Sequence, residues 1–292
     1  MIFNISFSGI QCTFEHFIPN SFLDTWLWKL DPWKIPHLSN ESGIVSVKRT
    51  ETQPLKDESL SLLSCETTGF FERRVYSTNS GTQWDFVRTV TDEVLLSYRV
   101  NKEWNSIELL QDNTQTKGIV ALEYLAQIMP GICLKHDVLS FHCALIEYEG
   151  NAIAVCARSG TGKTTHARLW RDYKNALILN GDRALCKKED KTWMAYGSPW
   201  SGTSGEQINR KAPLKALVIL ERADNNEVVQ LNSMEIFQNV FPHLVYPSWD
   251  KELLIKAMDQ LDDLINNVPV YKLKCKPDYN AVDTLHDAIW EK

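Results

Sequence analysis

Long hydrophobic runs, clustered cysteines and an excess of positive charge are all missing from this sequence. No apolar stretch approaches the roughly 20 residues that a membrane-spanning helix needs, and the first residues lack the basic start of a secretory signal. The net charge of −6 disfavours non-specific nucleic-acid binding, because such binding needs a basic surface that displaces counterions from phosphates. We therefore predict a cytoplasmic protein that has neither a membrane nor a nucleic acid as its partner. A homo-oligomeric state is left open.

The cysteines offer neither a disulfide framework nor a metal site. There are seven, an odd number, and no two have the C-x-x-C spacing of zinc or redox sites. Several lie inside apolar runs, which indicates buried, reduced thiols. With 43% hydrophobic and 23% charged residues over 292 positions, the chain can form one large domain or two modest ones with an ordinary core.

The chain changes character near its first third. Residues 1–115 contain short runs of β-branched and aromatic residues separated by turn signals, which predicts a β-rich region. Substrate or partner recognition is left open as the role of this region. Residues 118–129 have helical spacing that should end at Pro130. The order of strand, loop, helix and strand that follows predicts an α/β domain with α+β character and a mixed sheet over residues 116–292.

One motif indicates which ligand the chain binds. Residues 157–164 read Ala-Arg-Ser-Gly-Thr-Gly-Lys-Thr, which is the spacing of a phosphate-binding (Walker A) loop. Gly160 and Gly162 supply the backbone freedom that a close phosphate needs, Lys163 should reach the β and γ phosphates, and the Thr164 hydroxyl should bind Mg²⁺. The predicted nucleotide-binding residues are Ser159, Gly160, Thr161, Gly162, Lys163, Thr164 and Thr165.

The surroundings of this motif satisfy its structural requirement. A phosphate loop should follow a strand and open a helix, because the positive end of the helix contributes to phosphate binding. Residues 152–157 have the apolar character of a strand, and residues 164–173 have that of a helix. The sequence therefore predicts that ATP or another nucleoside triphosphate binds here, but the motif alone does not distinguish transfer from binding.

A predicted hairpin brings a histidine to the motif. Gly150 and Asn151 lie between two apolar runs, a pattern typical of a two-residue turn. Pairing outward from that turn places His142 opposite roughly Ser159, at the mouth of the loop. There an imidazole could orient the γ-phosphate or move a proton. A structural histidine at the end of a strand is the alternative.

A crossover should bring a carboxylate to the other side of the loop. Residues 175–180 form the next predicted strand, and a right-handed crossover makes it parallel to the motif strand. Its end then faces the phosphates, where Asp182 could bind Mg²⁺ or take the proton of an attacking hydroxyl. A simple turn aspartate is the alternative. The predicted catalytic residues are Asp182, His142 and Lys163, and the predicted metal ligands are Thr164 and Asp182.

Residues 196–215 form a polar loop rich in glycine and serine that is similar to a lid or substrate loop. Within it, Glu206 is a candidate second metal ligand or substrate contact, and Arg210 could neutralise the transferred phosphoryl group. A solvated loop face is the alternative for both. Arg183 could bind phosphate or cap its strand, and Arg222 is expected to end a strand.

The order of these features resembles the C-terminal kinase domain of HPr kinase/phosphorylase, a P-loop kinase related in its core to ATP-dependent phosphoenolpyruvate carboxykinase. The resemblance covers roughly residues 130–292. It is closer to a divergent bacterial branch with GKTTHxRLW-like, NDDR-like and YGxPWSG-like stretches, which here correspond to residues 163–170, 180–183 and 196–202.

The resemblance implies a site in which a histidine and an aspartate pair surround the γ-phosphate and Mg²⁺, with one aspartate acting as base. His142, Lys163, Thr164 and Asp182 match that pattern. The first aspartate of the pair is Gly181 here, so either one carboxylate does the work of two, or Glu206 helps, or catalysis is impaired. The phosphorylase signature loop is not recognisable.

Three functions follow from these residues. The first is an ATP- and Mg²⁺-dependent kinase that phosphorylates a serine-like hydroxyl on a peptide, protein or small molecule. The second is a nucleotide-binding module that recognises a peptide or protein without transfer, which Gly181 favours. A carboxykinase-type decarboxylase is less favoured, because the extra basic residues for a dicarboxylate and a second metal site are not apparent.

Overall fold

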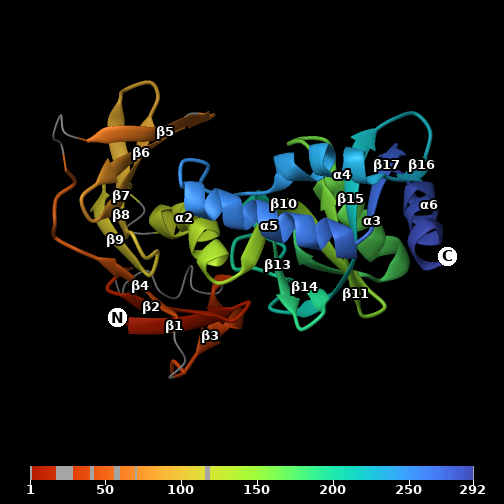
Figure 1. The fold of residues 1–292 in the computed structure, drawn as a ribbon, viewed down its shortest axis with the longest axis horizontal. Coiled ribbons are helices and arrows are strands. Elements are labelled where there is room, and N and C mark those ends of the chain that lie inside the picture. Colours follow the sequence, from red (N-terminus) through yellow and green to blue (C-terminus); the bar gives the residue numbers. More distant parts are fainter. Residues whose placement is uncertain are drawn as a thin grey trace. The chain divides into compact units, whose positions relative to one another are not determined.

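The computed structural model describes residues 2–17, 29–39, 43–55, 60–69, 71–115 and 119–291 (Figure 1). The chain divides into two compact units, Met1–His136 and Asp137–Lys292. Both units contain sheets and helices, so the predicted α/β class with α+β character is confirmed.

The N-terminal unit is built on a nine-stranded sheet in the order β3-β1-β2-β4-β9-β8-β7-β6-β5. Neighbouring strands are antiparallel except for the parallel pairs β2–β4 and β4–β9. This architecture confirms the β-rich character predicted for the first third of the chain. The strands are β1 (Ile2–Phe7), β2 (Ile10–Glu15), β3 (Lys34–Ile35), β4 (Ile44–Arg49), β5 (Ser61–Thr68), β6 (Phe71–Thr78), β7 (Gly81–Arg88), β8 (Glu93–Asn101) and β9 (Ser106–Asp112), with a 3-10 turn η3 (Asp31–Trp33).

Helix α2 (Ile119–Lys135) packs within this first unit. The Tyr98 hydroxyl donates to the Ala121 carbonyl at 2.6 Å, and the rings of Phe86 and Tyr124 meet edge to face at 4.6 Å. The structural boundary therefore follows His136, later than the predicted division between residues 115 and 116. The predicted start of the helix at residue 118 lies outside the described residues.

The prediction that this helix ends at Pro130 is wrong. Pro130 lies inside α2, and the helix continues to Lys135. An interior proline costs roughly 3 kcal/mol. The last turn nevertheless buries Ile132, Cys133 and Leu134, and burial of a large apolar side chain returns about 1.5–3 kcal/mol each. Apolar burial thus outweighs the local penalty.

The C-terminal unit contains a mixed eight-stranded sheet in the order β11-β10-β13-β14-β15-β17-β16, with β12 also paired to β10 and β11 also paired to β15. The β11–β15 and β15–β17 pairs are parallel and the other pairs are antiparallel, so the predicted mixed sheet is confirmed. The strands are β10 (Val138–Tyr148), β11 (Asn151–Cys156), β12 (Leu177–Asn180), β13 (Arg183–Glu189), β14 (Thr192–Tyr196), β15 (Lys211–Arg222), β16 (Glu227–Gln230) and β17 (Val270–Cys275). The helices are α3 (Lys163–Lys174), α4 (Ser233–Val240), α5 (Lys251–Asn267) and α6 (Tyr279–Trp290), and the 3-10 turns are η4 (Gly202–Ser204) and η5 (Phe241–His243).

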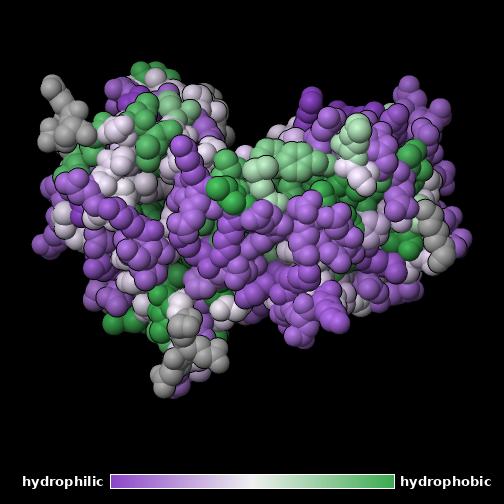
Figure 2. Space-filling view, viewed as in Figure 1, coloured by the Kyte–Doolittle hydropathy of each residue, from purple (hydrophilic) through white to green (hydrophobic). Residues whose placement is uncertain are grey.

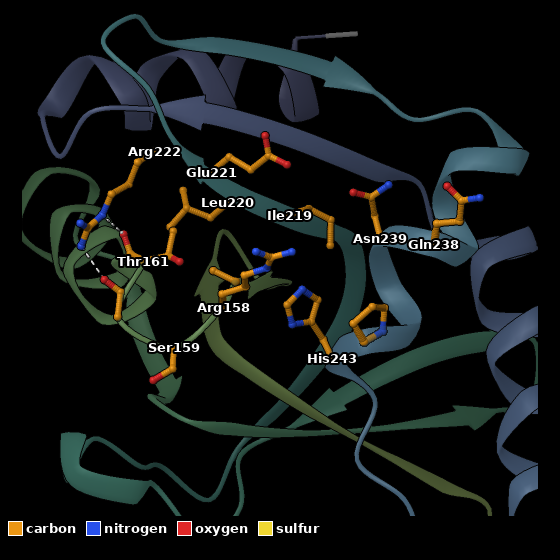
Figure 3. Close-up of a pocket in the computed structure, with 13 residues that line it drawn as sticks. Arg158, Ser159, Thr161, Ile219, Leu220, Glu221, Arg222, Gln238, Asn239 and His243 are labelled. Carbon is orange, nitrogen blue, oxygen red and sulfur yellow. Dashed lines mark hydrogen bonds between the residues drawn. The ribbon is translucent and has the colours of Figure 1, made fainter. Parts of the chain in front are cut away.

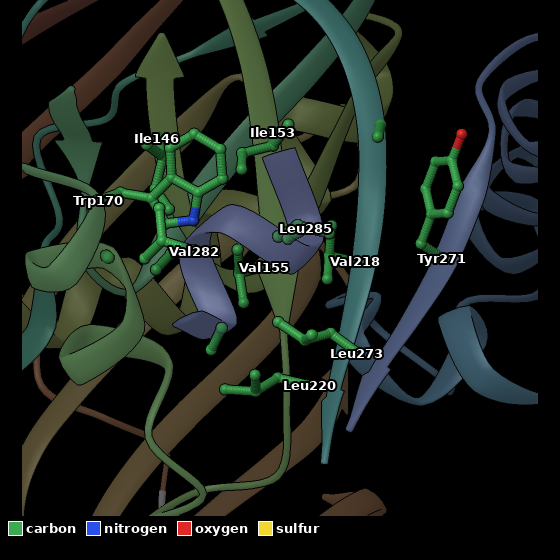
Figure 4. Packing of buried hydrophobic residues seen from close by; sticks show 14 of the residues in the cluster. Ile146, Ile153, Val155, Trp170, Val218, Leu220, Tyr271, Leu273, Val282 and Leu285 are labelled. Carbon is green, nitrogen blue, oxygen red and sulfur yellow. The ribbon is translucent and has the colours of Figure 1, made fainter. Parts of the chain in front are cut away.

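Helices α3 and α6 cover one face of this sheet. Trp170 of α3 and Leu285 of α6 are fully buried against apolar strand residues such as Val155 (Figure 4). Helix α5 packs through a buried row that includes Leu261, and its outer side is mostly hydrophilic in Figure 2. Asp263 of α5 also accepts from the Trp193 indole at 3.0 Å, which ties the helix to β14.

The β10–β11 hairpin turns one residue earlier than predicted. Glu149 and Gly150, with φ values of 49° and 73°, form the two-residue turn, and Asn151 already belongs to β11. Two consecutive positive φ values are typical of the type I′ turns that suit hairpins. Cys143 pairs with Cys156, so His142 lies one step further along, nearer the level of Ala157 than of Ser159.

The seven cysteines are all free, and each of them except Cys65 is buried. The predicted burial is therefore confirmed for six of the seven thiols, and Cys65 is exposed. Among the described residues, no helix combines the length and the apolar character needed to cross a membrane.

Candidate functional site

A glycine loop, residues 157–162, connects the end of β11 to the start of α3. The predicted strand before the motif and the predicted helix after it are both confirmed. Gly160 and Gly162 have φ values of 76° and 124°, a backbone region that side-chain-bearing residues rarely adopt. A β-carbon on either glycine would meet nothing within 4 Å, so backbone conformation rather than crowding requires glycine here.

Arg222, at the end of β15, supports this loop from one side (Figure 3). Its guanidinium donates to the carbonyl oxygens of Thr161 at 2.9 Å and of Gly160 at 2.5 Å. The sequence predicted only that Arg222 ends a strand, because a contact across 60 residues leaves no local pattern. These two hydrogen bonds satisfy loop carbonyls that helix α3 cannot reach.

Lys163 is buried at the first position of α3, with 8% of its surface exposed. Its ammonium group donates to the Ala157 carbonyl at 3.0 Å and lies 3.0 Å from Nε2 of His142. The predicted lysine and histidine therefore meet directly. Because an ammonium group has no acceptor, the histidine must accept at Nε2 in this contact.

His142 connects Lys163 to Asp182. Its Nδ1 lies 3.4 Å from Oδ1 of Asp182. Burial and the Lys163 charge lower the pKa of His142, and the Asp182 carboxylate partly opposes them. A neutral imidazole that accepts at Nε2 carries its proton on Nδ1, so that proton faces the Asp182 carboxylate. The structure thus brings the three predicted catalytic residues into one chain of contacts.

The predicted parallel orientation of the strand after α3 relative to the motif strand is correct, but a third strand lies between the two. Strand β12 pairs antiparallel with β10, which itself pairs antiparallel with β11, so β12 is parallel to β11 with β10 between them. The backbone N–H of Cys143 donates to the Asp182 carbonyl at 3.0 Å. This bond holds the end of β12 beside His142.

Asn180 sets the conformation of the segment that carries Asp182. Its side chain is fully buried, its Oδ1 accepts from the N–H groups of Asp182 at 2.9 Å and Arg183 at 2.7 Å, and its Nδ2 donates to the Ser198 carbonyl at 2.9 Å. An asparagine that bonds to the backbone two and three residues onward is a common turn device. The sequence prediction noted this stretch but assigned no role to its asparagine.

The remaining predicted site residues lie at the start of β13, in the first turn of α3 and in the glycine loop. Arg183 is buried at the start of β13, paired in register with His142. Thr164 is partly buried and Thr165 exposed in the first turn of α3, and Ser159 is exposed in the glycine loop. Their contacts with a nucleotide stay predictions.

Two polar residues of the 196–215 loop form ion pairs with charged residues other than those predicted for the site. The Glu206 carboxylate lies 3.2 Å from the Arg168 guanidinium and 3.1 Å from that of Arg171, both on α3. The Arg210 guanidinium donates to the buried Glu147 carboxylate at 2.8 Å. The structure therefore does not place Glu206 as a second metal ligand or Arg210 beside the transferred group.

Two cavities flank Arg222. The larger cavity, of about 610 Å³, lies between the glycine loop, the end of β15 and the α4–η5 segment (Figure 3). Arg158, Gln238, Asn239 and His243 contribute its polar side chains. Burial, with the charges of Lys163, His142 and Arg158, lowers the pKa of His243 to about 4, so its imidazole is neutral at pH 7. No local pattern in the sequence pointed to the α4–η5 wall.

The smaller cavity, of about 290 Å³, lies on the other side of Arg222. Leu220, Cys275 and Pro277 give it apolar walls, and Thr165 and His166 of α3 border it.

Comparisons with known proteins identify one family. The model of the family described as ScmC, SynChlorMet cassette protein ScmC, matches residues 106–285, more than half of the chain. None of the curated proteins matches the chain. Among solved structures, the HPr(Ser) kinase/phosphatase from Coxiella burnetii is similar with a TM-score of 0.31 and 10% sequence identity, over 52% of this chain and 93% of that chain.

Proposed function

We propose that this chain, which belongs to the family of SynChlorMet cassette protein ScmC, is an ATP- and Mg²⁺-dependent kinase that transfers the γ-phosphate to a hydroxyl group of a peptide, protein or small molecule. One observation carries the proposal. At a glycine loop that opens a helix, His142 lies 3.0 Å from the Lys163 ammonium through its Nε2 and 3.4 Å from the Asp182 carboxylate through its Nδ1.

Phosphate binding rests on the glycine loop and α3. The N-terminal end of a helix favours negative charge, and the Lys163 ammonium adds a full positive charge at the same place. In the structure that ammonium contacts the Ala157 carbonyl and the His142 imidazole. We expect the β and γ phosphates of ATP to replace one or both of these contacts.

The residues present fit a magnesium ion. Asp182 offers a carboxylate with 32% of its side chain exposed, and Thr164 offers a hydroxyl in the first turn of α3. Oxygen ligands of this kind are those that Mg²⁺ prefers, usually alongside phosphate oxygens and water. When bound, the ion neutralises charge on the phosphates during transfer.

Asp182 is also the group best placed to accept a proton. In the proposed reaction, the acceptor oxygen forms a bond to the γ-phosphorus, the bond to the β-γ bridging oxygen of ATP breaks, and the hydroxyl proton goes to Asp182. His142 orients that carboxylate through its Nδ1 and touches Lys163 through its Nε2. Positioning and charge neutralisation supply most of the catalysis in this reaction class, so this small set of residues is sufficient.

The resemblance to the HPr kinase/phosphorylase group supports this proposal. Residues 163–170, 180–183 and 196–202 resemble its divergent bacterial branch, and they supply Lys163 and Asp182.

Incubation with γ-labelled ATP, Mg²⁺ and hydroxyl acceptors tests the proposal. We expect transfer by the unaltered protein, loss of nucleotide binding in Lys163→Ala, and retained binding without transfer in Asp182→Asn. Lys191→Gln, which removes an exposed charge in the turn after β13, is the control. Nucleotide binding that survives Lys163→Ala unchanged would contradict the site.

A nucleotide-binding module without transfer is the second candidate. It is favoured by the crowding at Gly181, where a β-carbon would lie 2.2 Å from the Ser204 hydroxyl oxygen, so a second carboxylate has no room. Tight ATP binding by the unaltered protein, with neither transfer nor hydrolysis in any condition, would favour this candidate over the kinase.

A further inference from the structure

The two cavities beside the glycine loop differ in chemistry. Arg222 lines both of them, and its guanidinium bonds to the carbonyls of Gly160 and Thr161. The smaller cavity has apolar walls from Leu220, Cys275 and Pro277. Such walls suit the face of a nucleobase, whereas the larger cavity combines polar side chains with apolar ones such as Ile219 and Pro242 and has room for a second molecule.

The larger cavity also adjoins the proposed reacting groups. Segment η5, which carries His243, is fixed to β10 beside His142, because Leu244 bridges to Phe141 and the Val245 N–H donates to the Ser140 carbonyl at 2.8 Å. The wall of the larger cavity that carries His243 is therefore attached to the strand that carries His142, the histidine that contacts both Lys163 and Asp182.

An unneutralised cation belongs to this cavity. Arg158 is exposed, and within the described part of the chain its side chain has no hydrogen bond or ion pair. Figure 3 shows its guanidinium beside the His243 imidazole, with the Asn239 amide across the cavity. The carboxylate of Glu221 in the same wall is 3.2 Å from Lys272, which neutralises it.

These contacts match one kind of ligand. A guanidinium forms its strongest hydrogen bonds with carboxylates and phosphates, often with two parallel bonds. In the proposed function the phosphates of ATP are held by the backbone N–H groups of the glycine loop and by Lys163, which leaves the Arg158 side chain of that loop for the second substrate. Asn239 and His243 can bond to polar groups beside that anion.

We propose, building on the proposed kinase function, that the larger cavity binds the phosphate acceptor and that Arg158 recognises a carboxylate carried close to the acceptor hydroxyl. The carboxylate belongs either to a small hydroxy acid or to an acidic residue beside a serine in a peptide. Arg158 is a specificity residue in this arrangement, and Asp182 keeps the role of base.

Matched acceptors test this preference. N-acetyl-L-serine and N-acetyl-L-serinamide differ only in the carboxylate, and Ac-Glu-Ser-Ala-NH₂ and Ac-Gln-Ser-Ala-NH₂ differ only in a side-chain carboxylate. We expect one charged member to have a kcat/KM about tenfold or more above that of its neutral partner, as a charge-assisted hydrogen bond supplies. The pair that shows the difference identifies the source of the carboxylate.

Arg158→Gln should remove that preference by raising the KM of the charged acceptor, while the KM of ATP stays unchanged. Arg158→Lys should retain part of it, and Lys191→Gln should retain all of it. Equal activity on charged and neutral acceptors in the unaltered protein would overturn the inference. A fall in kcat on both acceptors, or a raised KM for ATP, in Arg158→Gln would also overturn it, because the guanidinium would then serve the phosphates.

A binding measurement separates this inference from the kinase proposal. Saturation-transfer NMR of the same four probes, with Mg²⁺ and a non-hydrolysable ATP analogue, reports acceptor binding without transfer. Suppose that the protein shows no transfer, that a charged probe binds better than its neutral partner, and that Arg158→Gln abolishes this preference. That result would support acceptor binding in the larger cavity and contradict the kinase proposal. Transfer with no preference for charged acceptors would support the kinase proposal and contradict the role of Arg158. Absence of binding by all four probes would overturn the inference.

Discussion

A β-carbon on Gly181 would lie 2.2 Å from the hydroxyl oxygen of Ser204, which is closer than any real contact of that kind. Ser204 of the η4 turn thus occupies the space that a side chain at position 181 would need. Ser204 is itself fixed, since its hydroxyl donates to the Ser201 carbonyl at 2.6 Å. The absence of a side chain at position 181 and the position of Ser204 in the η4 turn therefore depend on each other.

Gly181→Ala should destabilise the protein by about 1–3 kcal/mol, because an inserted methyl group forces a packed segment to shift. Ser204→Gly alone should have a smaller effect, and the double variant Gly181→Ala, Ser204→Gly should recover most of the loss. Urea unfolding of the three variants measures this. Independent, additive effects of the two substitutions would show that the residues do not compete for the same space.

Arg222→Ala should weaken ATP binding by about tenfold while leaving the fold intact, because two loop carbonyls lose charge-assisted hydrogen bonds worth about 1.5 kcal/mol or more in total. Arg222→Lys should be intermediate, since an ammonium group lacks the guanidinium fork that reaches both Gly160 and Thr161. Titration with a fluorescent ATP analogue measures the affinity. Arg88→Ala, an exposed arginine of the N-terminal unit, is the control, and an unchanged affinity in Arg222→Ala would contradict the role.

The Glu147–Arg210 pair should matter for stability. The Glu147 carboxylate is 5% exposed, whereas the Arg210 side chain is half exposed. Arg210→Gln leaves a buried carboxylate without its partner, so we expect a loss of about 2 kcal/mol, below the value for a fully buried pair. Adding Glu147→Gln should recover much of it.

The neighbouring Lys211 provides a matched control. It pairs with Glu189 at 2.6 Å, but both side chains are more than a third exposed. Lys211→Gln should therefore cost under about 1 kcal/mol. Equal losses in Arg210→Gln and Lys211→Gln, measured by thermal unfolding, would show that burial of Glu147 is not what makes its pair important.

Local patterns predicted the centre of the site. The glycine loop, its strand and its helix follow from spacing within about 20 residues, and hairpin geometry brought His142 to the loop within two positions of its place. Asp182 was found because a crossover restricts where the end of the next strand lies. These inferences need only chain connectivity and backbone geometry.

The remaining features depend on contacts that connectivity does not determine. Arg222 contacts the glycine loop although it lies 62 residues after Gly160 in the sequence. The α4–η5 segment, which carries His243, lies still further along the chain. Glu206 and Arg210 are candidate site residues in the sequence because polar loop residues are common in functional sites. In the structure Glu206 pairs with Arg168, and Arg210 pairs with Glu147. Pro130 is another case in which local sequence is insufficient. Proline usually ends a helix, but apolar burial stabilises α2 through Pro130 to Lys135.

His166 should make the stability of the protein depend on pH. It is 3% exposed, and its Nε2 accepts a hydrogen bond from the Trp170 indole at 3.1 Å. Burial lowers the pKa of His166 from 6.5 to about 4. Between those two values the unfolded chain binds a proton that the folded chain does not bind, so the free energy of unfolding falls as the pH falls from 6.5 to 4.

The contribution of His166 over that range is about 3 kcal/mol, since each pKa unit corresponds to about 1.4 kcal/mol. His166→Gln keeps an acceptor for Trp170 but does not titrate, so the loss of stability between pH 6.5 and pH 4 should shrink by about that amount. His243 has a lowered pKa for similar reasons and keeps part of the pH dependence. Urea unfolding at pH 7, 6, 5 and 4 measures the slope. The exposed His37, changed to Gln, is the control, and a slope in His166→Gln equal to that of the control would show that His166 is already protonated in the folded protein.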